Sequence, residues 1–156
     1  MKYILTLALL LMLPLTVASE ASSSEARADI ELSRVMINDK RNTALAFNMS
    51  FTEAERVAFW PLYEQYRKAM ENVGSRRLDM IIDYANHYDD MTETKAADLL
   101  RRAMVYEEQA LKVKQLYMEK FGEILPPTKL GRLYQIETRM DNAIQMKLSE
   151  GIPLME

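Results

Sequence analysis

Apolar residues recur at alternating steps of three and four along most of this chain, which is the spacing of helices that pack side by side. The most regular series predicts a helix over residues 93–122. Its seam comprises Leu99, Ala103, Tyr106, Ala110, Val113, Tyr117 and Phe121, and a second stripe beside it comprises Leu100, Met104, Leu111 and Met118. Seams of this length favour a coiled-coil-like arrangement of antiparallel helices.

A second long helix is predicted before it, over residues 53–88, with apolar positions that begin at Phe59. The phase of the pattern slips at Gly74, so we expect this helix to bend or unwind there. Pro61 lies inside the same helix and frees the carbonyl of Val57, which predicts a second kink. The helix is therefore expected to be a curved rod.

Capping signals set the helix boundaries. Thr52 followed by Glu55 matches a capping box, and Thr92 is the N-cap expected for the next helix. Shorter helices are predicted at about residues 29–48 and 128–149, and the loops between elements are short. Together these features predict an all-α fold of four helices, in which two long curved antiparallel helices are flanked by two shorter ones.

The start of the chain has the layout of a secretory signal peptide, with a basic beginning, a short apolar core and an exit of small residues within residues 1–18. The apolar run is too short to span a bilayer, so we expect a periplasmic protein with no stable membrane span after signal removal. Residues 19–28 predict a flexible N-terminus, and residues 29–156 predict a single helical domain. The chain has no cysteine, which excludes a lipoprotein and leaves stability to packing.

Composition narrows the function. A net charge of −3 argues against nucleic acid as a partner, and no polybasic patch is present for a membrane surface. The chain has one histidine and four glycines, and we find neither a nucleophilic triad with a suitably placed histidine nor a Gly-rich phosphate loop. The sequence therefore predicts a protein that is not an enzyme and has no cofactor.

Two helix starts of similar form lie forty residues apart: Phe51-Thr52-Glu53-Ala54-Glu55 and Met91-Thr92-Glu93-Thr94-Lys95. In an exported all-helical chain these starts resemble the LTxxQ family, which contains the Spy and CpxP periplasmic chaperones and envelope-stress regulators. Phenylalanine and methionine replace leucine at the first position, and glutamate and lysine replace glutamine at the fifth. The resemblance implies a helical hairpin fold, often a cradle-shaped homodimer, that binds unfolded proteins or the periplasmic domain of a sensor.

Ten of the twelve methionines lie after the predicted signal peptide, and together with the tyrosines of the seams they suggest an adaptable apolar surface for such partners. Ordinary core packing explains most of these residues equally well. The candidate partner-binding residues are Met70, Met80, Tyr84, Met104 and Met118.

Two alternatives stay open. His87, the single histidine, lies near Asp83, Asp89 and Asp90, and would be the centre of a metal site in a metal-responsive sensor similar to the related proteins ZraP and CnrX. One histidine without cysteine is a poor ligand set for a transition metal, and a histidine that caps a helix end is the competing interpretation. The second alternative is a structural protein that uses its helical seams for oligomerisation.

Overall fold

The computed structural model describes residues 37–155, apart from the side chains of residues 147 and 149–151. The predicted signal peptide, the predicted flexible segment 19–28 and the first part of the helix predicted at 29–48 lie outside the described residues. The chain divides into two compact units, residues 1–40 and 41–156. Of the first unit only residues 37–40 are described, and they are helical. The architecture below is that of the second unit.

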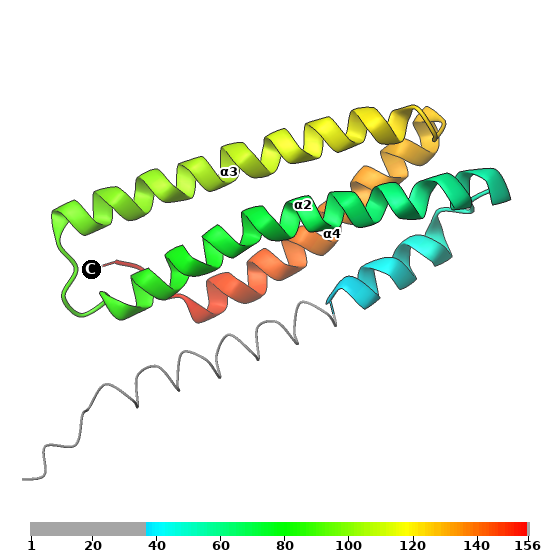
Figure 1. Cartoon of the computed structure of the whole chain (residues 1–156). Helices are drawn as coiled ribbons and strands as arrows, with labels where there is room; N and C mark the ends of the chain where they lie inside the picture. The colour runs from blue at the N-terminus through cyan, green and yellow to red at the C-terminus, as the bar shows by residue number, and fades with distance from the viewer. Residues whose placement is uncertain (1–36, 156) are drawn as a thin grey trace, which may run out of the picture. The chain divides into compact units, whose positions relative to one another are not determined.

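The second unit is entirely helical within the part that the structure describes. It begins with helical residues 41–48 and continues with α2 (Glu53–Asn86), α3 (Glu93–Gly122) and α4 (Pro127–Gly151). Figure 1 shows α2 and α3 as a long antiparallel hairpin, with α4 returning from the end of α3 towards the α2–α3 loop. The predicted all-α, four-helix fold is confirmed.

Local capping explains where the long helices begin. The Thr52 hydroxyl accepts a hydrogen bond from the Glu55 backbone N–H at 3.3 Å, and the Glu55 carboxylate accepts one from the Thr52 backbone N–H at 2.7 Å. These two bonds form the predicted capping box. Thr92 caps α3 in the same way, accepting from the backbone N–H of Lys95 at 3.2 Å. Because each cap satisfies a backbone group that lacks a partner in the first turn, the helix starts are fixed by adjacent residues.

Of the bend or unwinding predicted at Gly74, the unwinding is wrong, because α2 is one uninterrupted helix of 34 residues through both Pro61 and Gly74. Nothing lies within 4 Å of the position that a Cβ atom would take at Gly74, so no neighbour forces the backbone apart there. Val73 is buried just before the phase slip, and residues after it are half-buried, so the seam changes its packing partners without a break in the helix.

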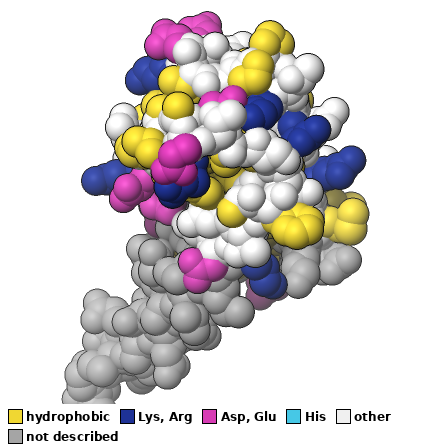
Figure 2. Space-filling model, turned by 90° about the vertical axis from the view of Figure 1, so that its right-hand side faces the viewer, with side chains coloured by type: hydrophobic (Ala, Val, Ile, Leu, Met, Phe, Trp, Pro, Cys, Tyr) yellow, Lys and Arg dark blue, Asp and Glu magenta, His cyan; other side chains and the backbone are white. Residues whose placement is uncertain are grey.

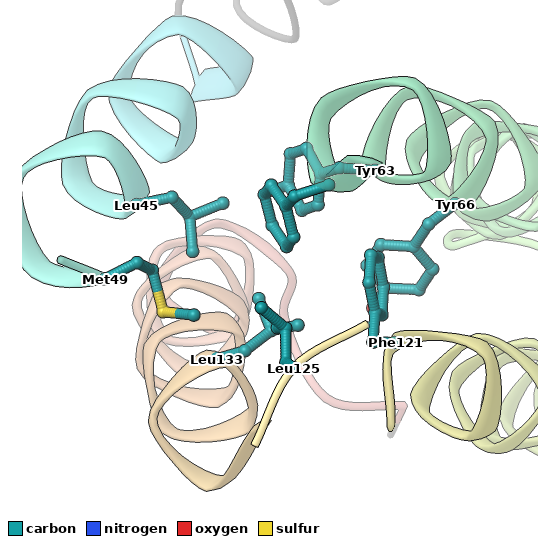
Figure 3. Packing of buried hydrophobic residues seen from close by; sticks show 8 residues of the cluster. Leu45, Met49, Tyr63, Tyr66, Phe121, Leu125 and Leu133 are labelled. Atoms are coloured by element: carbon teal, nitrogen blue, oxygen red, sulfur yellow. The ribbon is translucent and has the colours of Figure 1, made fainter. Parts of the chain in front are cut away.

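The hydrophobic core lies at the end of the unit where α2 begins and α3 passes to α4. Figure 3 shows its side chains converging from all four helical segments. The buried cluster comprises Leu45, Met49, Phe59, Tyr63, Tyr66, Phe121, Leu125 and Leu133. Aromatic rings dominate it; the rings of Phe59 and Phe121, for example, have centroids 5.3 Å apart. We call this region the packed end.

The surface of the packed end carries hydrophobic side chains interspersed with charged ones, as Figure 2 shows for the face seen along the bundle. At the opposite end of the α2–α3 hairpin, Leu99 is buried in the N-terminal half of α3.

Within the described part of the chain, no helix is both long enough and apolar enough to cross a membrane.

Candidate functional site

An open apolar groove of about 630 Å³ lies at the end of the hairpin away from the core. It runs between the C-terminal part of α2, the N-terminal part of α3 and the chain that follows α4. This volume is typical of small-ligand and peptide pockets. The lining residues are Arg77, Met80, Ile81, Tyr84, Glu93, Ala96, Ala97, Leu99, Leu100, Ala103, Ile152, Pro153, Leu154 and Met155.

Helical spacing and side-chain size produce this groove. Positions 77, 80, 81 and 84 of α2 share one face, and positions 93, 96, 97, 100 and 103 of α3 share another. Three of the α3 positions are alanines, at 96, 97 and 103, whose side chains are too small to fill the space between the two helices. The groove is therefore apolar and open because its floor consists of short side chains.

The C-terminal tail, Ile152–Met155, forms one wall of the groove. Tyr84 donates a hydrogen bond from its hydroxyl to the backbone carbonyl of Pro153 at 2.8 Å. The backbone of Ile152 is extended, and its side chain is half-buried. Leu154 is 87% exposed and Met155 is 47% exposed. The apolar tail thus lies beside the groove as one of its walls, and a hydrogen bond to its backbone joins it to α2.

Arg77 marks the edge of the groove on the side of α4. Its guanidinium donates to the side-chain oxygen of Gln145 on α4 at 2.5 Å and lies over the ring of Tyr106, 5.2 Å from the ring centroid. These contacts keep the last part of α4 beside the hairpin. They also hold the guanidinium at the rim of the groove.

At the far end of the hairpin, the Asp83 carboxylate links α2 to α3. It forms ion pairs with Arg102 and, at 3.0 Å, with Lys95, and His87 Nδ1 lies 3.2 Å from it. Hydrogen bonds from Lys95 and Arg102 hold the pKa of Asp83 below its usual value. His87 is the C-cap of α2, and its ring nitrogen also lies 2.9 Å from the backbone oxygen of Asp83. The Asp83 carboxylate is thus shared among three basic side chains.

The metal candidate, His87, therefore sits at a helix end with Asp83 as its acidic neighbour. Among the described residues, no group of three or more histidine, aspartate or glutamate side chains is placed to hold a metal ion.

The predicted partner-binding residues are divided between three places. Met80 and Tyr84 line the groove. Met104 is 56% exposed on α3, one turn beyond Leu100. Met70 and Met118 are half-buried and pack against the core cluster at the packed end. The groove therefore brings two of the five together, with Met104 continuing its α3 stripe.

Sequence reasoning did not predict the groove. It placed Ala103 in a packing seam and did not single out Ala96 and Ala97, although the spacing of the three alanines was a usable signal. Ala96, Ala97 and Ala103 fall on the same helical face as Leu100. A face of short side chains between two long helices predicts a gap where the neighbouring seams predict contact. The apolar tail was a second signal, because an apolar segment after a helix end needs a surface to cover it.

A buried polar network joins the helices between the core and the groove. Arg41 donates to Glu137 at 2.8 Å and to Asp141 at 2.6 Å, and the Tyr63 hydroxyl donates to Glu137 at 2.7 Å. Lys114 of α3 donates to Asp141 at 2.6 Å. Burial, together with the charge of Glu137, raises the pKa of Tyr63 far above its usual value, so Tyr63 stays a neutral donor.

Sequence reasoning did not identify this network, and Arg41 is its least expected member. It lies in a very polar stretch of the first helix, yet its side chain is buried, as is that of Glu137. The acidic partners are already paired with basic groups and with Tyr63. The network therefore clamps residues 41–48, α2 and α3 to α4, and the groove remains the part of the unit that is open to a ligand.

No family model, curated protein or solved structure matches this chain.

Proposed function

We propose that this protein is an exported helical binding protein, similar to the Spy and CpxP chaperones, that holds apolar segments of non-native polypeptides in the groove between α2 and α3. The observation that carries the proposal is the chain's own tail. An extended apolar peptide already lies against this groove, with its Pro153 carbonyl bound by the Tyr84 hydroxyl. A polypeptide segment of another protein offers the same apolar side chains and backbone carbonyls.

The lining suits a binder with little sequence preference. Met80 is flexible and polarisable, so it adapts to side chains of different shape. The alanines leave room for large residues, and Tyr84 recognises a backbone group that every sequence carries. Such a site discriminates apolar from polar segments without selecting one motif.

The expected affinity is low and reversible. A shallow groove takes two or three large apolar side chains, and each contributes about 1.5–3 kcal/mol when it is fully removed from water. Much of that gain is offset by the ordering of a flexible segment and by lost translational freedom. Weak, rapidly reversible capture is what a protein that only prevents aggregation requires.

The test compares two matched exposed leucines of α3. Leu100 lines the groove and is 61% exposed, whereas Leu116 is 49% exposed and is not among the lining residues. Replacing either by serine removes similar exposed apolar area and leaves the core cluster untouched. The assay is light scattering of an aggregating client protein mixed with residues 19–156 of this chain.

We expect wild type and Leu116→Ser to suppress aggregation at near-stoichiometric ratios, and Leu100→Ser to require several times more protein. Circular dichroism of both variants checks that they are equally folded. Equal potency of the two variants, or no suppression by wild type, would show that the groove does not hold clients.

A further inference from the structure

The tail that lies against the groove is held loosely. The hydrogen bond from the Tyr84 hydroxyl to the Pro153 carbonyl joins it to α2, and this bond is solvent-exposed. Leu154 projects almost wholly into solvent, Met155 is about half-exposed, and no tail residue belongs to the core cluster. A segment with so little buried apolar area opens at small free-energy cost.

We propose that the tail, Ile152–Met155, is a displaceable strap that competes with client segments for the groove; this inference rests on the proposed function. The strap and a client use the same donor, because the Tyr84 hydroxyl binds Pro153 in the closed state and is free for a client carbonyl in the open state. Met80 and Leu100, which a client would contact, line the same groove as the tail.

The geometry lets the strap leave without unfolding the unit. Arg77 binds Gln145 two turns before the end of α4, so α4 stays beside the hairpin when the tail detaches. The tail remains tethered one residue beyond Gly151, which gives it a high effective concentration at the groove. It therefore returns quickly to the Tyr84 hydroxyl when no client is bound.

Competition by the strap lowers the apparent affinity for a client by the fraction of molecules in the open state. One exposed hydrogen bond and the partial burial of Ile152 favour the closed state on the order of tenfold. Removing the strap should therefore tighten client binding on the order of tenfold.

The experiment measures binding of a fluorescently labelled client that is kept unfolded by reduction and alkylation of its cysteines. The readout is fluorescence anisotropy. Four forms of the mature protein are compared: wild type, a chain that ends at Gly151, the full-length Ile152→Ser variant and the Leu116→Ser control. We expect the chain that ends at Gly151 to bind about tenfold more tightly than wild type, Ile152→Ser to bind several-fold more tightly, and Leu116→Ser to match wild type.

Unchanged or weaker binding by both strap variants overturns the strap, and weaker binding assigns the tail to the client site itself. Leu100→Ser, placed in the chain that ends at Gly151, separates this failure from that of the proposed function. If client binding is lost in Leu100→Ser while strap removal has no effect, the groove binds clients and only the strap is wrong. If neither wild type nor the shortened chain binds the client, the proposed function fails together with the strap.

A second readout observes the strap directly. With ¹³C-labelled methionine methyl groups, the Met155 resonance should move towards its value in an unfolded peptide when client is added. A Met155 resonance that stays unchanged while client saturates the groove would show that the tail is not displaced.

Discussion

Glu137→Leu should be among the most destabilising single substitutions in this protein, because it removes the acidic member of a buried ion pair and leaves the basic member, Arg41, in place. Arg41 would keep Asp141 as a partner, but it would lose its 2.8 Å bond to Glu137 within a buried site. The Tyr63 hydroxyl would lose its acceptor as well. Removing one member of a buried ion pair costs about 3–5 kcal/mol, and the remaining bond to Asp141 places this case near 3 kcal/mol.

A loss of about 3 kcal/mol corresponds to a fall in melting temperature of roughly 12 °C for a unit of this size. The assay is urea unfolding followed by circular dichroism. The double variant Arg41→Leu/Glu137→Leu should recover part of the loss, since two apolar side chains replace two desolvated charges and Asp141 keeps Lys114. The buried polar network would be refuted as a stabilising feature by either of two results. One is a loss of less than about 1 kcal/mol in the free energy of unfolding for Glu137→Leu, and the other is a double variant whose loss equals the sum of the two single variants.

Four further predictions concern local features of the same unit. Thr52→Ala should lower the free energy of unfolding by about 1 kcal/mol in urea unfolding, because the capping box is lost, and no change would contradict the cap. Gly74→Ala should raise it by about 0.5–1 kcal/mol, since the added methyl group meets open space within a continuous helix; destabilisation would show that Gly74 is needed for its backbone. Leu45→Ala should cost about 2–5 kcal/mol in the same assay, because Leu45 is fully buried. Burial raises the pKa of Asp141, but the hydrogen bonds and charges of Lys114 and Arg41 outweigh it and hold the pKa below its usual value. The stabilisation that Asp141 contributes is therefore complete above about pH 4, its pKa in the unfolded chain, and is lost as the pH falls through its lower pKa in the folded chain. Asp141→Asn should therefore flatten the acid limb of a plot of unfolding free energy against pH.

The helices were predictable because their determinants are local. Thr52, Glu55 and Thr92 act on backbone groups within three residues, so reading the sequence placed two helix starts correctly. The unwinding predicted at Gly74 was wrong because a phase slip in the apolar pattern has two possible structural outcomes: a break in the helix, or a change of packing partners along an unbroken helix. Only the tertiary contacts decide between them.

The buried polar network and the groove depend on contacts between residues far apart in the chain. Arg41 and Glu137 are 96 positions apart, and nothing in the polar stretch around Arg41 indicates that this one side chain is buried. Tyr84 could be proposed for a binding surface from its helical position, but its bond to Pro153 requires that α4 end beside it. The methionines at 70 and 118 carry the same pattern as Met80, and packing against the core distinguishes them.

Hydrogen–deuterium exchange of residues 19–156, with and without a saturating unfolded client, tests the central claim most directly. If the groove holds the client, backbone amides should gain protection around positions 77–84 of α2 and 93–103 of α3, while residues 105–116 of α3 exchange as before. Protection confined to residues 105–116, or to the packed end, would contradict a client site in the groove.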